Sequence, residues 1–565
     1  MRLRSVAFCA MIALAAAPGL AQDFSIDDTL RADRSAVRAL QEQLNDLGFN
    51  AGAPDGAFGG KTQAALTAFA GRSPLDAPLG LTPEVAARVA SVHSGRFGNP
   101  FELANVVRPT GWSLTREAGR TDVRDDNPDC GACNVTPWIL AVGDLDGDGR
   151  DEVVLAGHLA DARFDLIDKP SVSYIFELDD TSNLVPFSGW APGEAAPARV
   201  HEREALVADF NGDGLNDLFI AATGYDASPF PGEQNVLVLS GPDGHRDVSM
   251  ANLPVQNDMA HGADAGDIDG DGDLDILVMT NQGRENILPY LLRNDGAGQF
   301  TQEPFSAILD PAFVDFKSRG RAHRAEYSTL RLLDVNGDGL LDLLLLARGE
   351  DPQRATRFSG TRRSLLFHNQ GDGTFSAGDM VELPTDRWGY GTFTNDADLL
   401  DIDGDGDGDL ILTQSTRKPN NGTWYNQYLQ VLMNEDGAWV DRTDTVLWPQ
   451  GYPSAEDWNF AISTSMADVD GDGDTDLVTR SLDTIWKDTP LDGMAMVGLN
   501  TGAGRFEPAA LDWLTGRDGY TDRSMIAGDL DGNGKGDIVA FGLNGRYGNG
   551  PDQTWGTRLR VHLRR

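Results

Sequence analysis

Acidic residues that could hold a metal ion recur in seven short loops of this chain. Each loop carries Asp at position 1, Asp or Asn at positions 3 and 5, Gly at positions 4 and 6, and Asp or Glu at position 9. The loops, numbered 1 to 7, begin 58 to 67 residues apart, at Asp144, Asp209, Asp267, Asp334, Asp401, Asp468 and Asp529. This steady recurrence indicates a repeated structural unit.

The donor set of the loops favours calcium. Side-chain oxygens at positions 1, 3, 5 and 9 are hard ligands, the glycines let the backbone turn around one ion, and the carbonyl at position 7 can complete the shell. Calcium accepts a flexible ring of oxygens, whereas Mg²⁺ demands a strict octahedron. Without a cation the clustered carboxylates would repel one another. We therefore expect Ca²⁺ in up to seven loops.

The candidate metal ligands are the side chains at these four positions of each loop. They are Asp144, Asp146, Asp148 and Glu152; Asp209, Asn211, Asp213 and Asp217; Asp267, Asp269, Asp271 and Asp275; Asp334, Asn336, Asp338 and Asp342; Asp401, Asp403, Asp405 and Asp409; Asp468, Asp470, Asp472 and Asp476; Asp529, Asp531, Asn533 and Asp537.

Two other interpretations of the loops fail. An EF-hand needs Glu at position 12, but here position 12 holds Leu155, Ile220, Val278, Leu345, Leu412, Thr479 and Ala540. A plain Asp-Gly turn without metal explains one copy, but not seven sets of clustered carboxylates. A short apolar run comes after each loop and is typical of a buried strand.

A second landmark completes the repeated unit. A turn of the type Asn-x-Gly-x-Gly-x-Phe occurs at 294–300, 369–375 and 500–506, with a variant at 434–439. Each unit therefore reads as strand A, metal loop, strand B, strand C, Asn/Gly turn and strand D. Seven units of four strands predict a mainly β fold, a seven-bladed β-propeller.

This pattern resembles the FG-GAP/VCBS repeat family, whose propellers also occur in integrin α-subunits. The resemblance covers residues 108–565 and implies calcium loops that join strands A and B on one face. The chain stops after residues 557–563, which read as strand C of the last unit. Trp112 comes after a turn and begins a spare strand, so we expect the strand near 111–116 to close the final blade. Such closure hides exposed strand edges.

A small helical domain is expected before the propeller. Val37, Leu40, Leu44 and Leu47 have helical spacing, a second helix is expected near 61–69, and a third opens at Pro83. Residues 33–92 form this domain and 93–107 a linker.

The helical segment resembles the peptidoglycan-binding domain type 1 family. The matching residues are Val37, Leu40, Gln41, Leu44, Leu47, Gly48, Pro54, Asp55, Gly56, Phe58, Gly59, Thr62, Ala65, Leu66 and Phe69. The resemblance implies binding to peptidoglycan or another envelope glycan. Because most of these residues belong to the core and turns, a docking or spacer module remains the alternative.

The first residues indicate export. Arg2 and Arg4 precede an apolar run at 6–17, and small residues precede a break at Gln22, as in a secretory signal peptide over residues 1–21. No later segment is apolar enough for a membrane helix. We therefore expect a periplasmic or extracellular protein associated with the cell envelope.

Two cysteines remain after the signal peptide. Cys130 and Cys133 are expected to form a small disulfide in an oxidising compartment. A redox pair would need a βαβ setting, and zinc would need two further ligands.

The net charge of the chain limits the classes of partner that it can bind. The chain has 87 acidic and 46 basic residues, a net charge of −41. Such a surface repels phosphate backbones, so nucleic-acid binding is excluded as a general function.

Three functions fit these observations: a secreted module that binds a protein or glycan, a carbohydrate-active enzyme such as a polysaccharide lyase, and a structural spacer. No nucleophile motif, HExxH helix or phosphate loop is visible, so we expect a binding protein rather than an enzyme. A ligand should meet the face opposite the metal loops, where cationic and aromatic side chains gather near the axis. The candidates are Arg203, His261, His323, Glu326, Tyr327, Trp388, Tyr390, Asn395 and Arg523.

Overall fold

The structure is a computed structural model of the chain. It describes residues 24–47, 49–72, 79–97, 101–107, 112–117, 120–125, 134–160, 168–180, 182, 184–280, 287–309, 327–347, 363–384, 392–417, 424–435, 437–447, 463–480, 497–508, 521–544 and 556–564. The predicted signal peptide and the cysteine pair Cys130 and Cys133 lie outside these residues. Within them, no helix is both long and apolar enough to cross a membrane.

Four helices form the N-terminal domain: α1 (Asp28–Ala32), α2 (Arg34–Asp46), α3 (Gly60–Arg72) and α4 (Pro83–Phe97). Two short strands, β1 (Ser25–Ile26) and β2 (Gly80–Leu81), pair in parallel. The side chain of Asp33 starts α2 by accepting hydrogen bonds from the backbone N–H groups of Ser35 and Ala36. Because α1 precedes Asp33, the domain begins before residue 33, which is where the sequence pattern places its start.

The core of this domain is built from the predicted apolar stripe. The buried side chains are Val37, Leu40, Leu44, Ala51, Ala65, Leu66, Phe69, Leu81, Val85 and Val89. Gln41 is also buried, and its amide donates to the carbonyl oxygen of Ala57 while its Oε1 accepts from the N–H of Gly56. Gln41 thus holds the turn between α2 and α3, which gives it a structural role.

Seven sheets come next, one for each metal loop, and confirm the seven-bladed propeller. In blades 2 to 6 the strands run in chain order from the axis outward. They are β12 (Glu202–Ala208), β13 (Asp217–Ala222), β14 (Val236–Leu239) and β15 (Arg246–Asp247); β16 (Ala260–Gly266), β17 (Asp275–Thr280), β18 (Tyr290–Asn294) and β19 (Phe300–Pro304); β20 (Tyr327–Leu333), β21 (Asp342–Ala347), β22 (Leu365–Phe367) and β23 (Val381–Glu382); β24 (Thr392–Leu400), β25 (Asp409–Arg417), β26 (Trp424–Glu435) and β27 (Ala438–Asp441); β28 (Ser463–Ala467), β29 (Asp476–Arg480), β30 (Val497–Asn500) and β31 (Phe506–Pro508).

Blade 1 is the largest sheet. It contains β6 (Asn134–Gly143), β7 (Glu152–Ala160), β9 (Tyr174–Leu178) and β10 (Leu184–Pro186), extended on the side of β6 by β5 (Arg120–Asp125) and β4 (Trp112–Glu117). A separate pair, β8 (Ser171–Val172) and β11 (Ala198–Arg199), and two short helices, α5 (Ser249–Asn252) and α7 (Thr443–Val446), lie in connections between the longer strands.

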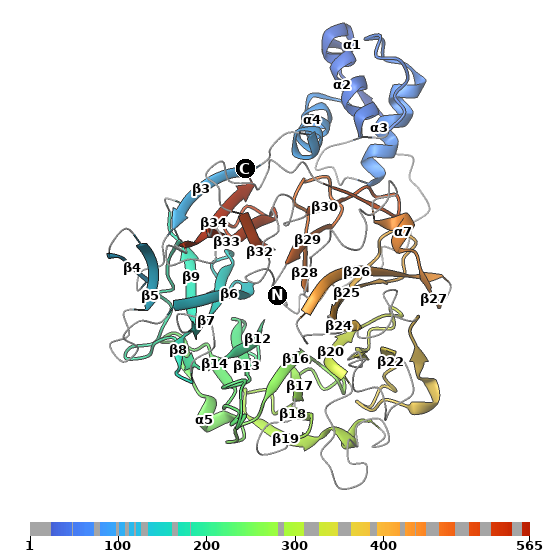
Figure 1. Cartoon of the computed structure of the whole chain (residues 1–565). Coiled ribbons are helices and arrows are strands. Elements are labelled where there is room, and N and C mark those ends of the chain that lie inside the picture. Colours follow the sequence, from blue (N-terminus) through green and yellow to red (C-terminus); the bar gives the residue numbers. More distant parts are fainter. Residues whose placement is uncertain are drawn as a thin grey trace.

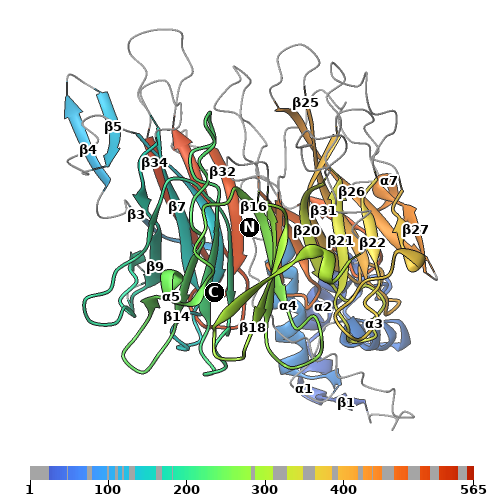
Figure 2. The same ribbon diagram turned by 90° about the horizontal axis from the view of Figure 1, so that it is seen from below.

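The first strands of the blades surround the axis, with blade 1 represented by β6 and blade 7 by β32 (Thr521–Gly528) (Figure 1). Figure 2 shows the same ring from the side. Neighbouring sheets pack face to face: Phe219 and Leu237 of blade 2 share a core cluster with Ile276 and Tyr290 of blade 3. Burial on both faces explains why strand B reads as a continuous apolar run in the sequence.

An N-terminal strand closes blade 7, but it is not the predicted one. Blade 7 contains β32, β33 (Asp537–Asn544), β34 (Gly556–Arg564) and β3 (Phe101–Val107), and β3 pairs antiparallel with β34. The strand expected at 111–116 instead forms the hairpin of β4 with β5. Only two residues separate β4 from β5, so their pairing closes a very short loop.

The expected linker over 93–107 is wrong for the same reason. Helix α4 continues to Phe97, and residues 101–107 are the closing strand itself. Gly98, Asn99 and Pro100 stand directly before Phe101, and this turn-forming composition makes the segment read as a linker in the sequence.

Candidate metal loops

Each of the seven loops connects the innermost strand of a blade to the next strand outward, in agreement with the sequence pattern. In loop 1, between β6 and β7, Gly147 and Gly149 have φ values of 76° and 85°. These left-handed conformations favour glycine, and the glycines at the same two positions of the other six loops also have positive φ. The pattern therefore encodes the backbone path as well as the candidate ligands.

Position 1 organises the loop interior. In loop 1, the two carboxylate oxygens of Asp144 accept hydrogen bonds from the N–H groups of Gly147, at 2.7 Å, and Gly149, at 3.0 Å. Loop 5 repeats this arrangement with Asp401, Gly404 and Gly406. The first aspartate thus holds the turn closed from within.

Position 9 connects three strands of one blade. In loop 5, Asp409 Oδ2 accepts from the N–H of Ile402 in its own loop, and Oδ1 accepts from the N–H of Asn434 at the end of strand C, both at 2.9 Å. Loop 6 has the same pair of contacts through Asp476. This carboxylate therefore joins the metal loop to the Asn/Gly turn.

The asparagine of that turn reaches the preceding blade. The Nδ2 group of Asn294 donates to the carbonyl oxygen of Phe210 in loop 2 at 2.8 Å, and that of Asn369 donates to Ile268 in loop 3 at 2.9 Å. The sequence pattern marks these asparagines as turn residues, but their side chains also link adjacent blades.

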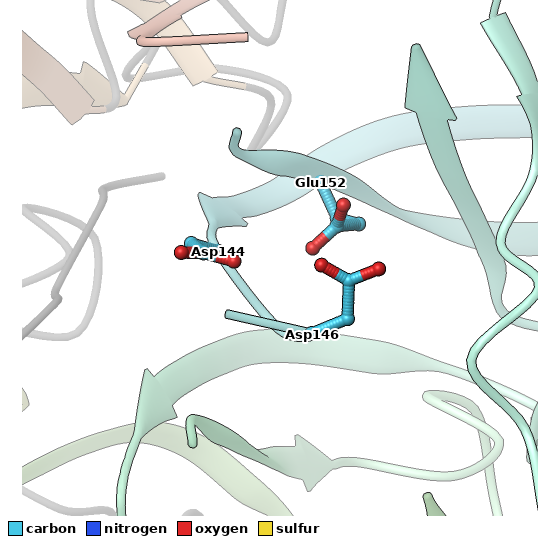
Figure 3. A group of neighbouring side chains, drawn as sticks. All are labelled: Asp144, Asp146 and Glu152. Carbon is cyan, nitrogen blue, oxygen red and sulfur yellow. The ribbon is translucent and has the colours of Figure 1, made fainter. Parts of the chain in front are cut away.

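Carboxylates converge in five of the loops. In each of these groups one oxygen per residue lies within 4.8 Å of the others: Asp144, Asp146 and Glu152; Asp267, Asp269 and Asp271; Asp401, Asp403 and Asp409; Asp468, Asp470 and Asp476; Asp529, Asp531 and Asp537. Figure 3 shows the first group, with the three side chains pointing toward one another. Loops 2 and 4 have Asn211 and Asn336 at position 3, the position that supplies a carboxylate to each of the five groups.

Burial, and at some positions the repulsion between neighbouring carboxylates, favours the protonated form of these acids. Burial raises the pKa of Glu152 to about 9, that of Asp537 to about 7 and that of Asp409 to about 6. At Asp146 and Asp403 burial is the main cause that raises the pKa, and the neighbouring carboxylate at position 5 raises it further. A bound cation would favour the charged form at every one of these groups. The donor set contains only oxygens, which fits a hard cation.

Four of the predicted ligand residues lie on inner strands at the end of the blades opposite the metal loops. Arg203, His261, Asn395 and Arg523 each stand six residues before position 1 of their loop. The strand register shifts at each of these residues, so all four occupy β-bulges on innermost strands. Bulges redirect side chains and are frequent beside functional sites. No local sequence signal marks this shared bulge.

The structure does not bring all nine candidates together on that face. Arg203 is half-buried and forms an ion pair with Asp226 at 2.8 Å, and His261 is half-buried. Tyr327 is 6% exposed and packs in the core with Leu330, so its assignment to the ligand face is corrected. The residues His323, Glu326, Trp388 and Tyr390 lie outside the described part of the chain.

A buried ionic cluster near the axis was missed by sequence reasoning. Arg331 of β20 contacts Glu204 of β12 at 2.9 Å and Asp396 of β24 at 2.6 Å. In the same region Asp264 of β16 accepts from the N–H of Leu332. The cluster joins strands from blades 2, 3, 4 and 5, and its directly paired members Arg331 and Glu204 lie 127 residues apart in sequence.

Family models match segments of both the propeller and the helical domain. The model described as "FG-GAP-like repeat" matches residues 209–278 and 334–412, which span loops 2 to 5. The model described as "Putative peptidoglycan binding domain" matches residues 33–72, which contain α2 and α3. A comparison with curated proteins gave no match.

Among solved structures, the chain is similar in fold to the exotype rhamnogalacturonan lyase YesX, with 13% identity, a TM-score of 0.36 and coverage of 80% of this chain and 75% of the lyase. Rhamnogalacturonan lyase YesW gives 14% identity, a TM-score of 0.32 and coverage of 74% and 81%. A subtype N11 neuraminidase-like protein of A/flat-faced bat/Peru gives 10%, 0.32, 67% and 92%. At these values the likeness carries no argument about chemistry. The chain is a seven-bladed β-propeller with FG-GAP-like repeats, preceded by a helical domain of the peptidoglycan-binding type.

Proposed function

We propose that this protein is exported, is anchored to the cell wall through its helical domain, and uses a calcium-braced propeller to bind a protein or glycan at the envelope. The observation that carries the proposal is the combination in one chain of a peptidoglycan-binding type domain with a propeller whose seven blades repeat the same acidic loop. A wall anchor joined to a propeller would hold the binding face of the propeller at the cell envelope.

Calcium would be held by the side chains at positions 1, 3, 5 and 9 of the loops. When bound, the ion supplies positive charge that offsets the clustered carboxylates. The chain's own contacts then transmit that effect: position 1 holds the glycine turns, and position 9 joins strands A, B and C of the blade. The metal would therefore have a structural role, because it would stabilise the connection between strands A, B and C of each blade.

The bulge residues on the opposite face support the binding of a ligand. Arg203 and Arg523 are cationic groups on an otherwise acidic protein, and His261 and Asn395 add hydrogen-bonding capacity. They come from blades 2, 3, 5 and 7, so a ligand on the axis could meet several blades at once. Glycan acids or acidic peptide segments suit such a set of donors.

Binding is proposed rather than catalysis. The acids at positions 1 and 9 of the described loops accept backbone hydrogen bonds that hold the loops together. We expect the purified protein to release no unsaturated or reducing ends from neutral or acidic polysaccharides. New ends that disappear in a His261→Ala variant would contradict this part of the proposal.

Cosedimentation with purified sacculi tests the anchor. The exported chain should pellet with sacculi at low and moderate salt, because the helical domain recognises the wall. A variant that lacks residues 24–97 but retains the closing strand β3 should stay in the supernatant. If the full chain also remains in the supernatant with calcium present, the helical domain is a docking or spacer module instead.

A further inference from the structure

Loops 3 and 4 differ from the other five loops in what their position 9 carboxylates contact. In loops 1, 2, 5, 6 and 7, one oxygen of that carboxylate accepts the N–H of position 2 in the same loop. In loop 3, Asp275 Oδ1 accepts the N–H of Asn294, and Oδ2 is bound by the guanidinium of Arg293. Both oxygens of Asp275 are therefore engaged by strand C.

The same guanidinium also reaches position 3. Arg293 Nη1 lies 2.8 Å from Asp269 Oδ2 and contacts Asp275 as well, so one nitrogen bridges positions 3 and 9 of loop 3. Its Nη2 lies 3.8 Å from Glu303 of β19, which holds the side chain from the outer edge of the blade. The Arg293 side chain is 21% exposed, so water only partly screens these contacts.

Other cations near the loops are placed differently. Arg150 of loop 1 pairs with Asp148 at position 5, and the converging group of that loop, Asp144, Asp146 and Glu152, includes position 9. In loop 3 the carboxylates of Asp267, Asp269 and Asp271 converge, and Asp275 at position 9 is not part of the group. Arg564 reaches loop 6 mainly through the backbone carbonyls of Asp468 and Asp470. Among the described loops, Arg293 is the guanidinium that contacts two ligand carboxylates at once.

The position of Arg293 in the repeat explains this difference. It immediately precedes the asparagine that ends strand C, and the same place is held by Leu239, Met433 and Leu499 in blades 2, 5 and 6. Those side chains are buried and apolar, so they cannot compete for a carboxylate. In blade 4 the place is held by His368, whose Nδ1 lies 3.1 Å from Asp342 Oδ2.

We propose that Arg293 takes the place of the metal ion in loop 3, so that this blade is closed by an internal cation and the propeller binds at most six calcium ions. The inference rests on the proposed binding of calcium by the other loops. An arginine charge bridging positions 3 and 9 offsets the same repulsion that calcium would offset, and its fixed fork suits carboxylates. Blade 3 should then be independent of calcium supply.

Counting bound calcium in the full chain tests this assignment. After chelation and dialysis, titration calorimetry and elemental analysis should give no more than six ions per chain. Arg293→Leu, which copies blade 2, should bind one ion more. Arg363→Met removes a surface arginine that pairs with Glu382, and it should leave the count unchanged.

A second pair of variants keeps the test valid if Arg293→Leu does not fold. Asp269→Asn should leave the count as it is, because position 3 of loop 3 holds no ion. Asp403→Asn at the same position of loop 5 should remove one ion. Seven ions in the unmodified chain, an unchanged count in folded Arg293→Leu, or one ion lost in Asp269→Asn overturns the inference. A chain that binds no calcium overturns the proposed function together with it.

Discussion

Excess EDTA should lower the melting temperature of the propeller by about 10–15 °C relative to millimolar calcium. A site at 100 times its dissociation constant contributes about 2.7 kcal/mol, and several loops act together. For an unfolding entropy of about 2.1 cal/mol/K per residue, such a sum corresponds to a shift of this size. Differential scanning calorimetry of the full chain with and without chelator measures it.

Two controls make this result specific. Ca²⁺ should restore the transition at lower concentrations than Mg²⁺, because the loops offer a flexible ring of oxygens. Asp403→Ala should lose only the share of one site, about 2–3 °C. A transition that is the same in EDTA and in calcium would refute the assignment of the loops as metal sites.

Replacement of Arg331 by methionine should reduce the free energy of unfolding by about 3–5 kcal/mol, because it leaves buried carboxylates without their partner. The side chains of Arg331, Glu204 and Asp396 are 4%, 9% and 2% exposed, so water cannot take over the lost contacts. The midpoint of urea unfolding, with calcium held constant, reports the effect.

A matched pair of variants separates this cluster from ordinary surface charge. Arg505→Met removes an exposed ion pair with Glu507 and should cost less than about 1 kcal/mol. Combining Arg331→Met with Glu204→Gln and Asp396→Asn should recover much of the loss, because no buried charge then remains unpaired. If the Arg331→Met variant has the same urea midpoint as the unmodified chain, the cluster does not hold the blades together.

The repeated unit could be predicted because its signals are local. Metal loop, apolar strand and Asn/Gly turn lie within one stretch of about 60 residues, and seven copies determine the blade number. The helices could be placed for the same reason, through the spacing of Val37, Leu40 and Leu44. Structure that depends on residues close together in the chain can therefore be predicted from the sequence.

Contacts between distant blades could not be predicted in this way. Arg331 and Glu204 stand on inner strands that face the axis from different blades, and their separation of 127 residues leaves no local pattern. The sequence predicts the wrong closing strand because a turn before Trp112 resembles the start of strand D. Which segment closes blade 7 depends instead on which one can reach β34. Arg293 could have been found by aligning the residue before each strand C asparagine.

The position of the closing strand also determines which hydrogen bonds would carry a mechanical load on the molecule. Three residues separate the end of α4, at Phe97, from the start of β3, at Phe101, and β3 has β34 as its neighbour at the outer end of its sheet. A pull on a wall-bound helical domain would therefore load the hydrogen bonds between β3 and β34 first, beginning where Phe101 lies opposite Arg564. Under stretching, blade 7 would part along this seam before the other blades carry force.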